Sequence, residues 1–241
     1  MRRNYVNALN RWQISALCGL LLAVAACSSL STSDGNYTPS TTTVPLTASA
    51  DPRADVTKAM RASLAAKSYR SRIVITSSSG SNRTMTAEVV APDRMHMTTE
   101  MDMPGRGTVK NETIIIGKET YVRAGDAPWQ KNPMGMGDLL SQFRDPKAID
   151  TIAEKAEVKY LGTDTLNGSP MLVYQYSMKD LLGPGKDGVS KIWIGATDSL
   201  QHQGESESDV DPLNTGKMIH SKTTVTFYDY NADIKIEPPM L

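Results

Sequence analysis

Short β-rich segments separated by turn signals make up most of the chain after residue 68, and they restrict the fold more than any other feature. Residues 69–76, 84–91 and 94–103 alternate apolar and polar side chains or are rich in β-branched residues. Asn167-Gly168 is a strong signal for a tight hairpin turn. About ten antiparallel strands are therefore predicted. The others are at residues 112–116, 120–123, 158–165, 171–178, 191–194, 201–208 and 217–228, with a last segment at 234–236.

Helices are predicted before and within this series of strands. Val56, Ala59, Met60 and Leu64 recur at helical spacing in residues 51–66. Two more helices are predicted in the middle of the series, at residues 138–143 and 146–157. A single antiparallel sheet of about ten strands must curl, and its concave face stays open unless helices cover it. The sequence therefore predicts an α+β fold with one curled antiparallel sheet covered by helices.

The first 26 residues have the layout of a signal peptide. Residues 1–11 contain three arginines and no acidic residue, and residues 14–25 are almost wholly apolar. This apolar run is shorter than the roughly 20 residues that a permanent transmembrane helix needs, although such an anchor is the alternative. Val24-Ala25-Ala26-Cys27 resembles a lipobox, the motif at which lipoproteins are acylated and cleaved. We therefore expect cleavage between Ala26 and Cys27 and a lipid anchor on Cys27.

The rest of the chain divides into a tether and a folded domain. Residues 27–50 are rich in Ser, Thr, Ala and Pro, a composition that cannot bury enough apolar surface to fold, and residues 51–241 form the domain. Cys18 lies in the signal peptide, so no internal disulfide is expected after cleavage. Removal of Arg2, Arg3 and Arg11 leaves 23 basic against 26 acidic residues, a net charge of −3. Because this charge does not attract phosphates, no nucleic-acid partner is expected.

Several short motifs, in order, are similar to those of one family. They are Ala91-Pro92-Asp93-Arg94, residues 112–116 followed by 121–123 and Trp129, Leu161-Gly162 with Asn167-Gly168, residues 192–195 before 198–200, and residues 229–239. The order resembles the periplasmic lipoprotein-carrier superfamily of LolA, LolB and the RseB sensor domain, and especially the actinobacterial LppX/LprG lipoproteins. Many of these carriers have a proline after the turn at 198–200, where this chain has Gln201-His202-Gln203. The departure leaves the subfamily and its ligand open.

The resemblance implies a half-open β-barrel, LolA/LppX-like, around an apolar cavity with helices as a lid. It also implies a lipid-anchored protein on the extracytoplasmic side of the cell membrane. Such a protein carries acyl chains of a lipid, glycolipid or lipoprotein across the envelope, with an envelope transporter as a partner. An alternative of the same fold is a sensor or scaffold that binds another envelope protein and has a filled core.

Methionines supply most of the candidate lipid-contacting residues. Met95, Met97 and Met101 should point to one face of their strand. Such flexible side chains adapt to different acyl chains, although an ordinary packed core is the alternative. The predicted cavity wall consists of Ile73, Ile75, Met85, Val89, Met95, Met97 and Met101, with Leu139, Leu140, Phe143, Ile149 and Ile152 from the lid helices and Trp193 from a later strand.

The sequence offers little for metal or catalytic chemistry. Met95-His96-Met97 and Met134-Gly135-Met136 contain ligands that suit Cu(I), but His96 should point away from its two neighbours on a strand. The chain lacks the G-x-S-x-G and H-E-x-x-H motifs and a phosphate-binding loop. We therefore expect a protein without enzymatic activity, metal or cofactor.

Overall fold

The computed structural model describes residues 47–103, 105, 107–133, 135–137, 146–179, 188–210 and 218–241. Several predictions lie outside these residues: the signal peptide, Ala26 and Cys27, the tether up to residue 46, Met134, and the helix at 138–143 with Leu139, Leu140 and Phe143.

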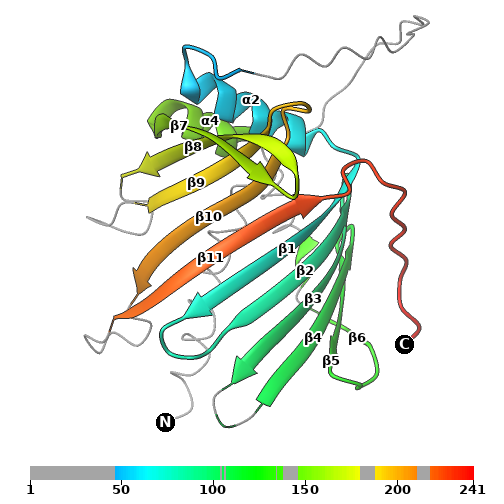
Figure 1. Cartoon of the computed structure of the whole chain (residues 1–241). Coiled ribbons are helices and arrows are strands. Elements are labelled where there is room, and N and C mark those ends of the chain that lie inside the picture. Colours follow the sequence, from blue (N-terminus) through cyan, green and yellow to red (C-terminus); the bar gives the residue numbers. More distant parts are fainter. Residues whose placement is uncertain are drawn as a thin grey trace, which may run out of the picture.

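The described residues form one curled antiparallel sheet of eleven strands, covered by helices at one end (Figure 1). The sheet order is β6-β5-β4-β3-β2-β1-β11-β10-β9-β8-β7. Strands β1 and β11 therefore pair in the middle, and β6 and β7 are the two edge strands, each paired on one side. The predicted α+β fold with a curled, unclosed sheet is therefore confirmed. The strands are β1 (Ser68–Ser77), β2 (Arg83–Val90), β3 (Arg94–Met103), β4 (Gly107–Ile116), β5 (Glu119–Ala124), β6 (Gln130–Lys131), β7 (Glu157–Leu166), β8 (Ser169–Met178), β9 (Gly188–Gly195), β10 (Gln201–Val210) and β11 (Ile219–Tyr228).

Two helices of the described residues pack on the sheet. Helix α2 (Pro52–Leu64) begins where the Asp51 carboxylate accepts hydrogen bonds from the backbone N–H groups of Arg53 and Ala54, at 3.0 and 3.2 Å. Helix α4 (Pro146–Lys155) lies against α2, and the Arg61 guanidinium contacts the Asp150 carboxylate at 2.6 Å. The two helices therefore form one layer.

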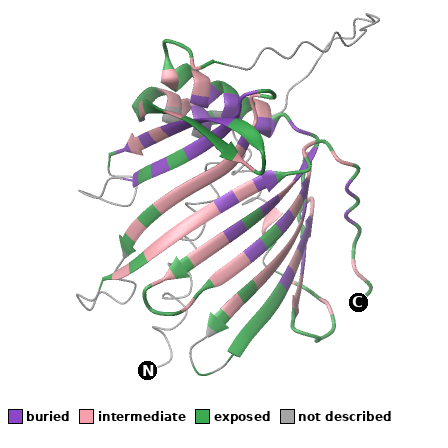
Figure 2. Cartoon of the chain, in the orientation of Figure 1, coloured by how far each residue is buried: buried purple, intermediate pink, exposed green. Residues whose placement is uncertain are grey.

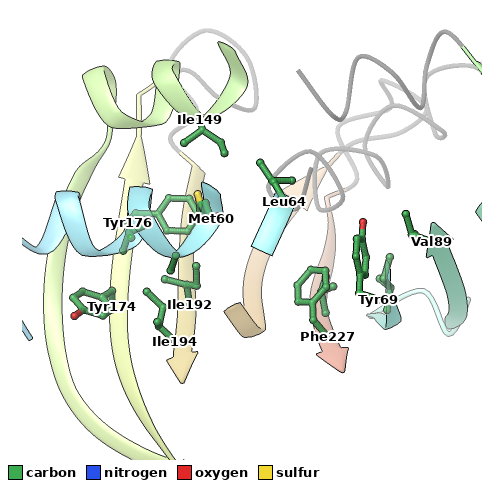
Figure 3. Packing of buried hydrophobic residues seen from close by; sticks show 14 of the residues in the cluster. Met60, Leu64, Tyr69, Val89, Ile149, Tyr174, Tyr176, Ile192, Ile194 and Phe227 are labelled. Carbon is green, nitrogen blue, oxygen red and sulfur yellow. The ribbon is translucent and has the colours of Figure 1, made fainter. Parts of the chain in front are cut away.

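The main hydrophobic core lies between this helical layer and the sheet. Met60 of α2 and Ile149 of α4 belong to the same cluster as Tyr176 and Ile192, which come from the neighbouring strands β8 and β9, and Met60 lies next to Tyr176 (Figure 3). Buried positions concentrate near the helices, and the far ends of β1–β4, β10 and β11 are half-buried or exposed (Figure 2). The helices therefore cover only part of the sheet. We call the face on which they pack the inner face and the opposite one the outer face.

The C-terminal segment covers part of the outer face. Ile234 and Ile236 pack against Ile114 of β4 and Tyr121 of β5. The Arg94 guanidinium donates a hydrogen bond to the Ile236 carbonyl at 2.6 Å. The strand predicted at 234–236 is wrong, because these residues are buried by packing across the strands instead of by pairing with them.

The edge strand β7 is irregular. Its pairing with β8 shifts register between Tyr160 and Gly162. Gly162 has a φ of 124°, a backbone conformation that favours glycine. A β-bulge therefore divides β7 into two halves.

A buried carboxylate on the outer face links several strands. Glu112, with its side chain 9% exposed, accepts from Arg123 at 2.9 Å and lies 3.2 Å from the Lys110 ammonium. Burial raises the pKa of Glu112, but the hydrogen bonds from Arg123 and Lys110 outweigh that effect and lower it below its usual value. Its contribution to stability is therefore present above the unfolded-state pKa of about 4.3 and is lost as pH falls through the folded-state value.

Replacement of Glu112 with glutamine should destabilise the fold in a pH-dependent way. At about pH 7 the loss should be about 1–3 kcal/mol, because two cations lose their carboxylate partner. The difference from the wild type should shrink as the pH is lowered and Glu112 becomes protonated. Urea unfolding across this pH range measures the effect, and Glu100→Gln, at an exposed outer-face position of β3, is the control. A loss that stays constant with pH would contradict this account.

Candidate functional site

Strand register places the predicted methionine and isoleucine residues on the inner face. Directly opposite residues of antiparallel strands share a face. The pairs Ile73–Met85, Val89–Met95 and Arg83–Met101 therefore align on the side that contacts the helices. Ile75 and Met97 lie on the same side and pack against the core.

The inner face changes from buried to half-exposed along the strands. Ile73 is only 2% exposed, and Met85, Val89 and Met95 are also buried. Ile75 and Met101, which lie one row beyond Ile73 and Met85, are half-buried, and Val109 beside Met101 is 39% exposed. Met97, which aligns with the buried Ala87, is half-buried as well. The apolar surface thus continues beyond the part that the helices cover.

A hollow lies on the inner face of β8–β11. Its cavity volume is about 20 Å³, room for about one water molecule. Tyr176, Ser190, Thr223, Val225 and Phe227 are among the residues that line it. Its lining combines hydroxyl groups and apolar side chains with Lys191, Gln201 and Glu205. The inner face therefore has a small recess next to the half-exposed Ile75, whose neighbour Thr223 lines it.

Trp193 does not belong to this face. It packs against Met171 and Val173 on the outer face, and its indole N–H donates to the Asp164 carboxylate at 2.9 Å. The prediction that Trp193 lines the same cavity wall as the methionines of β2 and β3 is wrong. Ile192 and Ile194, its neighbours in β9, contribute to the core beneath the helices instead.

The predicted lid is described only in part. Ile149 is 4% exposed and belongs to the main core. Ile152 lies within α4, although its side chain is outside the described part of the chain. The Arg53 guanidinium of α2 donates to the Ala153 carbonyl of α4 at 3.2 Å. Helix α4 is thus placed by its contacts with α2 as well as by its apolar side.

The proposed copper ligands separate on the sheet. His96 lies on the outer face, 4.0 Å from Glu88 and 3.6 Å from Glu112, whereas Met95 and Met97 lie on the inner face. These three side chains therefore do not converge on one ion. Among the described residues, no group of three or more His, Cys, Asp or Glu side chains is placed to hold a metal. No described helix is long and apolar enough to cross a membrane.

Charge is strongly divided between the two faces. The register of the described strands places every charged side chain except one on the outer face. The exception is Arg83, at the start of β2, which aligns with Ile75 and Met101. The sequence prediction missed it because its strand began at Thr84. The alternation of Met85, Ala87 and Val89, extended back by one step, places Arg83 on the same face.

Comparisons with known proteins show similarity in structure. No family model and no curated protein matches the sequence. The crystal structure of lipoprotein LppX from Mycobacterium tuberculosis aligns with a TM-score of 0.55 and 13% identity, and covers 77% of this chain and 97% of LppX. This chain has the fold of LppX. LprF from Mycobacterium bovis aligns with a TM-score of 0.53 and 12% identity, covering 78% of this chain and 96% of LprF.

The LppX fold agrees with the resemblance found in the sequence motifs. A LolA superfamily protein from Nitrosomonas europaea also matches, with a TM-score of 0.29 and 10% identity, covering 79% of this chain and 96% of that protein. We base the assignment of the fold on LppX and LprF, whose TM-scores exceed 0.5. At these identities the likeness establishes the fold, and the ligand must be argued from the residues of this chain.

Proposed function

We propose that this protein is a membrane-tethered lipoprotein that binds acyl chains on the inner face of its sheet and carries them across the cell envelope. The half-exposed apolar strip of Ile75, Met97 and Met101 is the observation that carries this proposal. These side chains lie on the same face as the buried core, and Ile75 and Met97 pack against it. A flexible apolar surface of this kind accommodates chains of different shape. In this proposal the role is binding and transfer, without catalysis.

The tether and anchor complete the proposed mechanism. Residues 1–26 act as the signal peptide, and acylated Cys27 holds the domain at the extracytoplasmic surface through residues 27–50. Lipid, glycolipid or lipoprotein acyl chains are the cargo, and an envelope transporter is a partner. In this mechanism, helix α4, which bears Ile149 and Ile152, moves to admit and cover a chain.

A sensor or scaffold role is the second candidate function, and the filled helical end of the core favours it. Tyr174 and Ile192 are 0% exposed beneath α2. The Tyr174 hydroxyl donates to the Asp55 carboxylate at 2.8 Å, which ties the sheet to the helix. A protein that signals through its outer surface needs no empty space at this end. The two functions therefore differ in whether the inner face takes up a ligand.

Native mass spectrometry of a soluble form that begins at Ser28 tests the proposal. This form keeps all the described core residues, which lie between Val56 and Ile236. After incubation with vesicles of bacterial lipids, we expect a mass above that of the chain alone, with the difference removed by organic extraction and identified as lipid. The same protein unfolded before incubation is the control. A chain that keeps its own mass throughout would support the sensor function.

A further inference from the structure

Arg83 is the one charged residue that the described strands place on the inner face of the sheet. Ile75 and Met101 lie directly opposite it on β1 and β3, and Val109 follows on β4. Its guanidinium contacts the Met101 sulfur at 3.9 Å, which is a weak acceptor. Within the described part of the chain, no carboxylate forms an ion pair with it. Among the residues that the structure describes, this half-buried cation therefore has no anionic partner.

The contrast with Arg70 shows what Arg83 lacks. Arg70, on the outer face of β1, contacts the carboxylates of Glu88 and Asp229, each at 2.8 Å. Burial lowers the pKa of Arg83, whereas the hydrogen bonds that Arg70 donates to Asp229 and Glu88 raise the pKa of Arg70. Moving a cation away from water is costly unless an anion replaces the lost solvation. The environment of Arg83 is therefore suited to an anion from outside the sheet.

We propose that Arg83 binds the anionic group of an amphiphile whose acyl chain lies along the inner face. The planar guanidinium fork matches a carboxylate or a phosphate group. From Arg83 to Val89 is six residues along β2, or about 20 Å at the usual rise of a strand. A chain anchored at Arg83 would pass Met85 and Met97 toward the helices. This inference rests on the proposed function and adds the chemical class of the ligand.

Binding of three amphiphiles that share one chain length tests the inference. Palmitate carries a carboxylate, hexadecyl phosphate carries a phosphate, and hexadecanol carries no charge. On the form that begins at Ser28, we expect wild-type protein to bind at least one anionic amphiphile roughly ten-fold more tightly than hexadecanol. Arg83→Met should remove this preference while leaving hexadecanol binding unchanged. Preference for palmitate or for hexadecyl phosphate identifies which anionic group is recognised.

Two further variants make the result specific. Arg72→Met removes an exposed arginine from the outer face of β1, and it should leave the preference intact. Arg83→Lys keeps the charge but loses the planar fork, so it should retain part of the preference. Thermal unfolding should show that Arg83→Met is as stable as the wild type. If that variant does not fold, Arg83→Lys still tests the inference, because only the affinity for the anionic amphiphile should fall.

The possible outcomes separate the inference from the function on which it rests. Equal binding of all three amphiphiles by the wild type, unchanged in Arg83→Met, would overturn the role of Arg83 and leave lipid binding in place. Absence of binding of any amphiphile to the wild type would overturn the proposed function and the inference with it.

Discussion

Replacing Cys27 with alanine is expected to abolish acylation and to leave the signal peptide attached. The thiol is the group that accepts lipid in the lipobox interpretation, and alanine offers no substitute. Two or more acyl chains, at about 0.8 kcal/mol per buried CH₂, anchor a protein stably where a single chain does not. Metabolic labelling with a fatty-acid analogue should therefore tag the wild type and miss the variant entirely. Cleavage should fail as well, so the variant should migrate as the larger precursor.

The matched control is the other cysteine. Cys18→Ala should be labelled and processed like the wild type, because Cys18 lies within the apolar run without small residues before it. Equal labelling of Cys27→Ala and the wild type would overturn the anchor assignment.

Replacing Ile73 with alanine is expected to cost about 2–5 kcal/mol of unfolding free energy, the largest effect on stability that we predict. Ile73 is 2% exposed and packs in the main hydrophobic core, so truncation leaves a cavity. Met97 lies on the same face but is half-buried. Met97→Gln should cost roughly 1 kcal/mol, because fewer partner atoms are lost, while its polar amide should weaken lipid binding. Urea unfolding and lipid-uptake assays measure the two effects.

The variants Ile73→Ala and Met97→Gln together distinguish a ligand-binding wall from a filled core. A Met97→Gln protein that keeps full lipid uptake but loses several kcal/mol of stability would favour the sensor function. In that case Met97 would behave as Ile73 does, and the inner face would be packed along its whole length.

Local signals were sufficient to predict most of the sheet. The bounds predicted for β3 are those of the structure, because Pro92-Asp93 marks its beginning. Asn167-Gly168 correctly predicted the turn between β7 and β8, where Asn167 has the positive φ that this turn requires. The first half of β4 was missed because residues 107–111 are all exposed and show no apolar alternation. Strand β6 has only two residues, too few for any pattern.

The site was harder to predict, because faces depend on tertiary packing. Ile192, Trp193 and Ile194 are consecutive apolar residues, so nothing in their order shows which of them points inward. Both faces of β9 are buried there, with Trp193 in a separate outer cluster. The place of Arg83 on the inner face, in contrast, follows from the sequence once the predicted strand is extended by one residue, from Thr84 back to Arg83.

The bulge in β7 has a consequence for the behaviour of this protein among its own copies. A free edge strand exposes backbone donors and acceptors that can pair with another extended chain, which is a route to aggregation. Strand β7 presents such an edge along ten residues. Because the register shifts between Tyr160 and Gly162, a straight strand cannot form regular backbone hydrogen bonds with both halves of β7. An incoming strand can therefore match only one half, and the bulge protects an open sheet from polymerising through its longer edge.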